Sequence, residues 1–378
     1  MKVMVNALSA RQGGIVTYTR NLMRSFRDRG VTAIFAVPEQ FPTEEGVRLL
    51  RLPASQYGAA RRFLWEQTIW REMVRSENPD VLYSSANFAL SRCPVPQVLL
   101  MREGGLFDPL YLANITPQQG LVLAGMRTIR RWVMRYSMRV ADLTLTPTEA
   151  MRDMLAQWEP RVASGFRVNH YGTLANMFAP SDAPRVWRED GTLRLLYVSV
   201  YYPHKCVGLV VEVARRLCEM GIKTHALLTT TLDEIQTTPG NALDYKQVEQ
   251  GLKEGLITLG HLDYADLPDV YRSHDLFLFP SVSETFGHPM AEALSSGIPI
   301  VAADTSVNRE ICGEAALYHH PFAIEDTCRL VRELDRDAAL RARISSIGPG
   351  RIKRLFSWGD HVDRLLKALE EAAALKRQ

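Results

Sequence analysis

The stretch SETFGHPMAEALSSGIPIVAAD, residues 283–304, places two glutamates on either side of a Gly-His-Pro turn. Pro289 suits the first turn of a helix, where its missing N–H leaves no hydrogen bond unmade, and Gly287 gives the backbone the freedom to enter that turn. A later glycine followed by a proline is a typical helix end. The stretch therefore predicts a loop that carries Glu284 and a helix that carries Glu292.

Two short apolar runs border this helix, DLFLFPS at 275–281 and IPIVAAD at 298–304. Each run predicts a buried strand of a parallel sheet. Open sheets of this kind bind ligands at the carboxyl ends of their strands, and the N-terminus of the next helix offers unpaired N–H groups to an anion. Glu284 is thus expected at a ligand-binding edge. The alternative for a pair of surface glutamates is simple solvation.

The same alternation of strand-like and helical runs fills the chain of 378 residues, with seven strand-like runs in its first half and six in its second. A chain of this length exceeds the usual size of one hydrophobic core. We expect an α/β protein with two doubly wound parallel-sheet domains at residues 1–177 and 193–356. A linker rich in Pro, Asp and Gly is expected at 178–192, and an amphipathic helix at 357–378.

Composition limits the class of protein. The hydrophobic content is 46%, and no apolar run reaches the roughly 18 residues of a membrane-spanning helix. The first residues enter a strand pattern without the architecture of a signal peptide, which predicts a cytoplasmic location. Five scattered cysteines without a C-x-x-C pair predict reduced thiols. The pattern Asp335-Arg336-Asp337 predicts solvated acids on a helix surface, not a metal site.

Charge is distributed unevenly along the chain. Residues 1–180 hold 22 basic and 14 acidic side chains, whereas the remaining residues hold 23 and 28. In MRTIRRWVMRYSMR, residues 126–139, apolar residues alternate with Arg127, Arg130, Arg131, Arg135 and Arg139. A basic amphipathic helix that contains Trp can rest on an anionic membrane surface. The alternative is an ordinary surface helix that packs by its apolar side, and no nucleic-acid partner is predicted.

Two further loops carry residues suited to phosphate. The run SARQGGIVTYTRNL, residues 9–22, places Gly13 and Gly14 between the first strand and a helix, where paired glycines let the backbone approach a phosphate. The run lacks the G-x-G-x-x-G spacing of dinucleotide sites, and a tight turn is the alternative. In YYPHK, residues 201–205, Lys205 lies at the mouth of another helix, where its point charge can meet a diphosphate.

In this order, the motifs resemble those of glycosyltransferase family 4, whose members are retaining enzymes of the GT-B fold. The resemblance covers essentially the whole chain, and it favours bacterial surface-polysaccharide mannosyl- and rhamnosyltransferases. It implies two Rossmann-like domains that face each other across a cleft, with a C-terminal helix that returns to the first domain. The matching residues are the E-x7-E pair Glu284 and Glu292, then Glu310, Gly13-Gly14-Ile15, VNHYGT at 168–173, Lys205, and FSW at 356–358.

The resemblance also implies roles for these residues. Glu284 would lie beside the hydroxyls of the donor sugar, Glu292 would bind the ribose, and Lys205 would neutralise the diphosphate. Gly13 and Gly14 would approach that diphosphate from the other domain. The co-substrate would be a nucleotide-diphosphate sugar, and neither a metal nor another cofactor is implied. Further donor-binding candidates are Ser199, Phe286, Gly287, His288 and Pro289.

Two positions depart from the family pattern. Ser199-Val200 stands where members commonly have Gly-Arg, so a second cation for the diphosphate is missing. Arg102-Glu103 stands where many members have His-Asp. We therefore add Arg102 and Glu103 to the catalytic candidates, with Arg102 supplying the missing positive charge from across the cleft.

The predicted function is retaining transfer of a hexose, of mannose or rhamnose type, from a nucleotide-diphosphate sugar. The acceptor would be a saccharide or a lipid-linked oligosaccharide in cell-surface polysaccharide synthesis. No side chain identifies itself as a covalent nucleophile, which favours front-face attack assisted by the leaving group. The alternatives are a nucleotide-sugar epimerase on the same fold and a non-catalytic protein that binds sugar nucleotides. A sugar phosphorylase is disfavoured, because it would hold pyridoxal on a lysine in a much longer chain.

Overall fold

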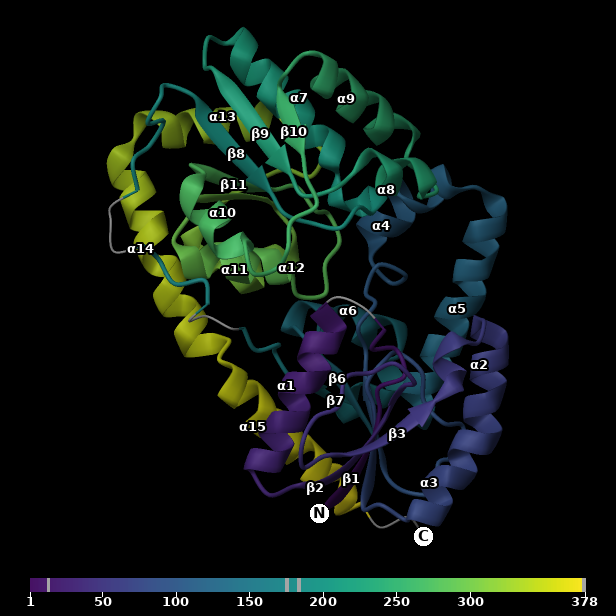
Figure 1. The fold of residues 1–378 in the computed structure, drawn as a ribbon. Helices are drawn as coiled ribbons and strands as arrows, with labels where there is room; N and C mark the ends of the chain where they lie inside the picture. The colour runs from purple at the N-terminus through teal and green to yellow at the C-terminus, as the bar shows by residue number, and fades with distance from the viewer. Residues whose placement is uncertain (12–13, 174–176, 182–184, 376–378) are drawn as a thin grey trace. The chain divides into compact units, whose positions relative to one another are not determined.

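The computed structural model describes residues 1–11, 14–173, 177–181 and 185–375 (Figure 1). Within these residues the chain forms two compact units. In each unit, strands of a parallel sheet alternate with helices along the chain. The first unit comprises Met1–Gly104, Arg127–His170 and Gly359–Gln378, and the second comprises Gly105–Met126 and Tyr171–Trp358.

The described part of the first unit has a seven-stranded sheet in the order β3-β2-β1-β4-β5-β6-β7, and its strand pairs are parallel. Its strands are β1 (Lys2–Asn6), β2 (Thr32–Pro38), β3 (Arg48–Leu52), β4 (Val81–Ser84), β5 (Gln97–Leu100), β6 (Leu143–Thr146) and β7 (Phe166–Val168). Its helices are α1 (Gly14–Asp28), α2 (Ala59–Trp65), α3 (Arg71–Glu77), α6 (Glu149–Trp158) and α15 (Trp358–Ala373), and α5 (Leu121–Val140) begins in residues of the second unit.

The described part of the second unit has a six-stranded parallel sheet in the order β10-β9-β8-β11-β12-β13. Its strands are β8 (Leu193–Tyr197), β9 (Thr224–Leu228), β10 (Ile257–Leu259), β11 (Leu276–Phe279), β12 (Ile300–Ala303) and β13 (Leu317–His319). Its helices are α4 (Pro109–Asn114), α7 (Val207–Glu219), α8 (Leu232–Thr237), α9 (Ala242–Lys253), α10 (Leu267–Ser273), α11 (His288–Ser296), α12 (Ser306–Cys312), α13 (Ile324–Arg336) and α14 (Ala338–Leu355). The predicted α/β fold with two parallel sheets is confirmed.

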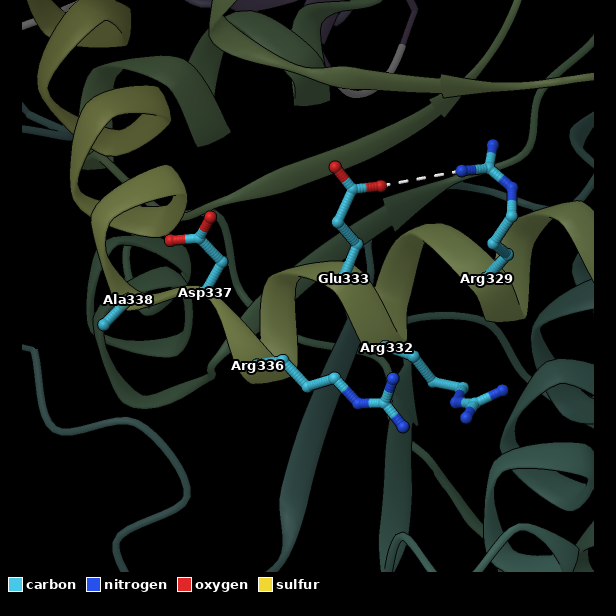
Figure 2. A pocket seen from close by; sticks show the side chains of 6 residues that line it. All are labelled: Arg329, Arg332, Glu333, Arg336, Asp337 and Ala338. Atoms are coloured by element: carbon cyan, nitrogen blue, oxygen red, sulfur yellow. Dashed lines mark ion pairs between the residues drawn. The ribbon is translucent and has the colours of Figure 1, made fainter.

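A shallow surface hollow of about 520 Å³ lies over the C-terminal end of α13 (Figure 2). Its lining is strongly charged, and Arg329 and Glu333 form an ion pair across one turn of the helix. The lining residues are Arg329, Arg332, Glu333, Arg336, Asp337 and Ala338. None of the residues that the sequence nominated for a ligand site lies in this hollow.

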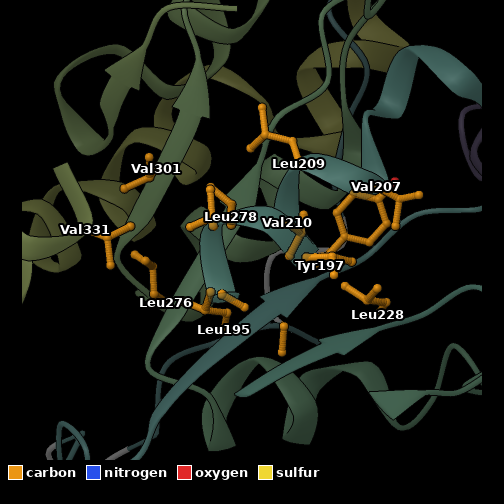
Figure 3. Packing of buried hydrophobic residues seen from close by; sticks show 14 of the residues in the cluster. Leu195, Tyr197, Val207, Leu209, Val210, Leu228, Leu276, Leu278, Val301 and Val331 are labelled. Atoms are coloured by element: carbon orange, nitrogen blue, oxygen red, sulfur yellow. The ribbon is translucent and has the colours of Figure 1, made fainter. Parts of the chain in front are cut away.

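The core of the second unit forms between the sheet and helices α7 and α13 (Figure 3). Leu276 and Leu278 of β11 are completely buried, and they belong to one cluster with Val210 of α7 and Val331 of α13. Burial of each such side chain contributes about 1.5–3 kcal/mol to folding relative to exposure. The strand β11 is apolar at every position because it lies inside a parallel sheet, as the run DLFLFPS predicted.

Helix α15 packs within the first unit, although it follows the second unit in the chain. Arg29 donates to Asp363 at 2.9 Å, and Arg167 donates to Glu371 at 2.6 Å. The ring of His361, buried on the inner side of the helix, lies 2.9 Å from the Tyr18 hydroxyl. The predicted return of the C-terminal helix to the first domain is confirmed. No helix in the described residues combines the length and the apolar character needed to cross a membrane.

Candidate active site

Two loops at the carboxyl edge of the second sheet bring Lys205 and Glu284 together. The strands β8 and β11 are adjacent and parallel, so the loops that follow them leave the sheet at the same edge. The first loop forms a 3-10 turn, Pro203–Lys205, and the second carries Glu284. Lys205 Nζ donates to Glu284 Oε1, and the two side chains keep 12% and 8% of their exposure. The site thus contains a largely buried ion pair from two separate segments of sequence.

Backbone and side-chain contacts brace both loops. The carbonyl of His204 accepts a hydrogen bond from the Val282 N–H at 3.0 Å. The buried Asn308 donates from Nδ2 to the carbonyl of Ser281 at 3.2 Å and to that of Ala303 at 2.8 Å. These bonds tie the loop after β11 to its neighbours on both sides. Lys205 and Glu284 are therefore held by structure beyond their own contact.

Helix α11 starts at His288, directly after the loop. Gly287 adopts a φ of +80°, in the left-handed region, and a Cβ there would lie 2.4 Å from Met290 Cε. Any other residue at this position would be strained. Pro289 occupies the first turn, as the sequence predicted, so the N-terminus of α11 follows Glu284 by a few residues.

Glu292 occupies a very different environment on the inner side of α11. Its Oε1 accepts from the Tyr264 hydroxyl at 3.0 Å, and its Oε2 accepts from the Tyr271 hydroxyl at 3.1 Å. Burial raises the pKa of Glu292 to about 7, because a carboxylate is poorly solvated there, while the two hydroxyls oppose that shift. Close to neutral pH, Glu292 therefore exchanges between a neutral acid and a carboxylate that accepts hydrogen bonds.

Two other motifs of the sequence contact Phe286. Its ring centre lies 5.1 Å from that of His288, 5.6 Å from that of Tyr171, and 5.4 Å from that of Phe356. Tyr171 belongs to VNHYGT and Phe356 to FSW, so both motifs support the loop that carries Glu284. A Cβ on Gly172 would lie 2.5 Å from Trp358 Cα, which shows how closely the two motifs approach.

Two other predicted donor-binding residues, Ser199 and Gly14, belong to different units. Ser199 donates from its hydroxyl to the Val200 carbonyl at 2.8 Å, and its N–H donates to the Thr229 hydroxyl at 3.0 Å. The side chain of Val200, the departure from the family pattern, is 61% exposed. Gly14 is the first residue of α1, and Gly13 lies outside the described residues.

Arg102 and Glu103 belong to the first unit, whereas Lys205 and Glu284 belong to the second. Glu103 accepts two hydrogen bonds from the Arg130 guanidinium, at 2.6 and 2.8 Å. The guanidinium carbon of Arg102 lies 5.7 Å from the centre of the Tyr18 ring. Contacts of this kind are common among partly buried surface residues. The catalytic roles of Arg102 and Glu103 therefore stay predictions.

Sequence analysis missed Asp108 and Tyr111, which lie beside the site loops within the second unit. Asp108 caps α4 by accepting from the Leu110 N–H at 2.9 Å, and it also bonds the side chain of Ser283. Burial raises the pKa of Asp108, and these hydrogen bonds oppose the rise. The ring of Tyr111 lies 5.4 Å from that of His204. The Asp-Pro pair is a typical helix start and could have revealed α4, although not its partners.

Three other acidic residues have structural contacts. The backbone carbonyl of Glu310 accepts from Arg351 at 2.7 Å. The expectation that Asp335 is solvated is wrong, because its carboxylate accepts from the Trp187 indole N–H at 2.9 Å and pairs with Arg188 at 3.0 Å. Asp337 caps α14 through the Leu340 N–H at 2.9 Å. The described residues contain no cluster of three His, Cys, Asp or Glu side chains placed to hold a metal ion.

Comparison with known proteins identifies family models and relatives that match both halves of the chain. Residues 13–172 match the family model of the glycosyl transferase 4-like domain, and residues 184–351 match that of the glycosyl transferases group 1. A mannosylfructose-phosphate synthase of Agrobacterium fabrum is 33% identical over 37% of this chain, and the match spans 31% of that relative's length. A GDP-mannose-dependent alpha-mannosyltransferase of Mycobacterium tuberculosis is 24% identical over 79% of this chain and 77% of its own.

The fold agrees with a solved structure of Anabaena HepE in complex with UDP-glucose. The TM-score is 0.70 at 15% sequence identity, and the alignment covers 98% of this chain and 100% of the other. At that identity the likeness concerns the fold alone. The chain therefore belongs to the glycosyltransferases of the GT-B fold, with a glycosyl transferase 4-like half followed by a glycosyl transferases group 1 half.

Proposed function

We propose that this glycosyltransferase moves a hexose from a nucleotide-diphosphate sugar to a saccharide or lipid-linked oligosaccharide, with retention of configuration. The observation that carries the proposal is the buried Lys205–Glu284 pair at the carboxyl edge of the second sheet, next to the start of α11. Desolvation of a buried ion pair often outweighs the attraction between its charges, so stability alone does not explain this pair. A diphosphate and a sugar hydroxyl are ligands that suit this cation and this carboxylate.

In the proposed reaction the bond between the sugar C1 and the diphosphate oxygen breaks, while the acceptor oxygen bonds C1 on the same face. The acceptor proton passes to an oxygen of the departing phosphate. Lys205 and the N-terminal end of α11 stabilise the charge that develops on the diphosphate. Glu284 holds a hydroxyl of the donor sugar, and Glu292 accepts from the ribose. Since Lys205 supplies the positive charge, the transfer needs no metal in this scheme.

The donor is proposed to carry mannose or a related hexose, and the product to enter cell-surface polysaccharide. The GDP-mannose-dependent relative described above supports this donor class. We further propose that the chain is cytoplasmic and meets the inner face of the cell membrane peripherally through residues 127–139. The basic character of that segment supports the contact.

The first test is thermal stabilisation by a panel of GDP-, UDP-, ADP- and dTDP-sugars. A ligand at about 100 times its dissociation constant adds roughly 2.7 kcal/mol of stability. One nucleotide should stand out, and Lys205→Ala and Glu292→Ala should each abolish its effect. The matched control is Lys253→Ala, an exposed lysine on α9 that pairs with Glu249. No stabilisation by any of the sugars would contradict the proposal.

A second candidate is a protein that binds the donor without turning it over, which Val200 favours because it leaves one diphosphate cation absent. Incubation of the stabilising sugar nucleotide with oligosaccharide acceptors, followed by mass spectrometry, separates the two functions. Release of free nucleotide diphosphate with a glycosylated product supports transfer. An epimerised sugar nucleotide without acceptor would indicate the third class, an epimerase.

A further inference from the structure

Helix α5 carries a large apolar face that the described residues leave uncovered. Soluble proteins rarely expose a contiguous apolar group of this size without a partner for it. The helix packs through Met134, Ser137 and Met138, its buried side chains, whereas six of its other apolar side chains stay exposed. The exposed fractions are 92% for Leu121, 80% for Val122, 65% for Met126, 66% for Ile129, 64% for Trp132 and 37% for Tyr136.

These six residues, the α5 stripe, follow the helix on one side. At about 100° per residue they fall within an arc of about 140°, and they extend along about 22 Å of the axis. The rings of Trp132 and Tyr136 stack, with centres 6.2 Å apart. Trp and Tyr prefer the boundary between apolar and aqueous phases, because each combines a large apolar ring with a polar group.

Arginines border the α5 stripe on both sides. By the same helical spacing, Arg130 lies at one edge, and Arg135 and Arg139 lie at the other. Arg130 pairs with Glu103, whereas Arg135 and Arg139 share Glu159. These three arginines, the arginine rim, thus share two carboxylates and keep a net positive charge.

We propose that α5 docks on an anionic phospholipid bilayer, with the α5 stripe buried at the boundary of headgroups and acyl chains. The inference rests on the membrane contact proposed above, which was argued from the basic residues. Here the α5 stripe makes the main contact, and the arginines add to it. The contact also begins at Leu121, before the basic segment. The arginines meet lipid phosphates at the rim.

Charge decides between this occupant and a second copy of the chain. Two copies joined through the α5 stripe would bring like-charged arginine rims together, which is unfavourable. An anionic lipid surface complements the same rims. Five arginines along the helix also oppose a transmembrane position, so α5 lies in the plane of the interface.

The test is co-sedimentation with vesicles of phosphatidylcholine, with and without phosphatidylglycerol. The full chain should bind the anionic vesicles and bind the neutral ones less. The double variant Ile129→Ser, Trp132→Ser should lose about 10-fold or more in vesicle affinity, because two large apolar side chains no longer leave water. In the full chain, Trp fluorescence should shift to the blue on binding, and Trp132→Phe should remove most of that shift while binding persists.

Two controls isolate the α5 stripe. Leu243→Ser removes a leucine of α9 that is 64% exposed and is not part of the α5 stripe. Arg332→Gln with Arg336→Gln removes two arginines from the charged hollow on α13 (Figure 2). Both should bind vesicles like the unaltered chain. Donor-induced thermal stabilisation, measured without vesicles, should be the same in all these variants, so a failure of docking is separable from a failure of the donor site.

Vesicle affinity that the Ile129→Ser, Trp132→Ser variant retains would overturn the proposal. The proposal would also be overturned if the unaltered chain did not bind vesicles and formed a dimer, while the double variant was a monomer. Size-exclusion chromatography with light scattering measures the oligomeric state of both. Equal binding to neutral and anionic vesicles would overturn the assignment to anionic lipid.

Discussion

The two carboxylates Glu284 and Glu103 follow strands of the two sheets and both pair with a basic side chain, yet they differ in burial. Lys205 and Glu284 keep 12% and 8% of their exposure, whereas Arg130 and Glu103 keep 38% and 35%. An exposed pair contributes about 0–1 kcal/mol to stability. Removal of one partner from a buried pair costs about 3–5 kcal/mol, because the other charge is left uncompensated.

This difference in burial indicates which ion pair takes part in the chemistry. Water can replace either partner of the Arg130–Glu103 pair at little cost, so that contact needs no ligand to explain it. Lys205 and Glu284 are held away from water by braced loops, at the edge where parallel sheets bind ligands. In the proposed complex the donor would satisfy both charges.

Breaking the buried pair should have the largest effect. Lys205→Ala should lower turnover of the preferred sugar nucleotide by about 10²–10³-fold, because one preorganised cation for the diphosphate is lost. Steady-state kinetics with the donor found by thermal stabilisation measures this. The matched variant Arg130→Ala should stay within about 2-fold of the unaltered enzyme, as expected for an exposed pair. An equal loss in both variants would remove the distinction between the two pairs.

Glu292, the second glutamate of the E-x7-E pair, should make the stability of the protein depend on pH. The pKa of Glu292 is about 7 in the folded protein and near 4.5 in the unfolded chain, so folding takes up a proton between these values. The stabilising contribution is complete below about pH 4.5 and is lost as the pH rises through 7. Relative to Glu292→Gln, the unaltered protein should lose up to about 3 kcal/mol between pH 4.5 and 8. Urea unfolding of both proteins across this range measures it, and parallel curves would contradict the assignment.

A third prediction concerns the support of α11. A Cβ on Gly348 of α14 would lie 2.6 Å from the Leu294 carbonyl oxygen, so Gly348→Ala should destabilise the protein by about 1–3 kcal/mol. Gly350 lies in the same helix, but a Cβ there would meet open space, and Gly350→Ala should be neutral or stabilising by up to about 1 kcal/mol. Thermal unfolding of the two variants compares them directly, and equal shifts would show that α14 does not hold α11 by close approach.

The smallest expected effect is that of Tyr264→Phe. The variant keeps the ring, whose centre lies 5.7 Å from that of Phe178, and removes the hydroxyl that Glu292 accepts from. Since that hydrogen bond lowers the pKa of Glu292, the variant should move the midpoint of donor binding to higher pH. The stability cost should be about 1 kcal/mol. A pH series of donor affinity measures the shift, and an unchanged midpoint would separate Tyr264 from the titration of Glu292.

Sequence alone was sufficient for the architecture, because parallel strands buried on both faces give apolar runs such as LFLF of β11. It also located the start of α11, because the conformational preferences of Gly287 and Pro289 are local and do not depend on tertiary contacts. Lys205 and Glu284 could be assigned to one edge of a sheet from the alternation of strands and helices. These features depend on local chemistry and on the topology that it implies.

Partners that come from distant segments could not be predicted. Tyr264 and Tyr271 carry no pattern that points to Glu292, and the raised pKa of Glu292 follows from a burial that the sequence does not display. Asp335 lies in a helical surface pattern, yet a linker residue, Trp187, reaches it. For α5, the amphipathic pattern is the same whether its apolar side is packed or exposed, so the structure was needed to distinguish these.

The pairing of β11 with β8 also affects the rate at which the protein folds. Leu276 pairs with Leu195, which lies far earlier in the chain, so this part of the sheet closes a long loop and forms slowly. Amide protons of β11 should exchange with solvent through cooperative opening of the sheet, later than those of the loop around Tyr264. Lys205 follows one of these strands and Glu284 follows the other. During refolding, donor binding should therefore appear together with the slowest kinetic phase. The time at which donor binding appears then indicates when the sheet is complete.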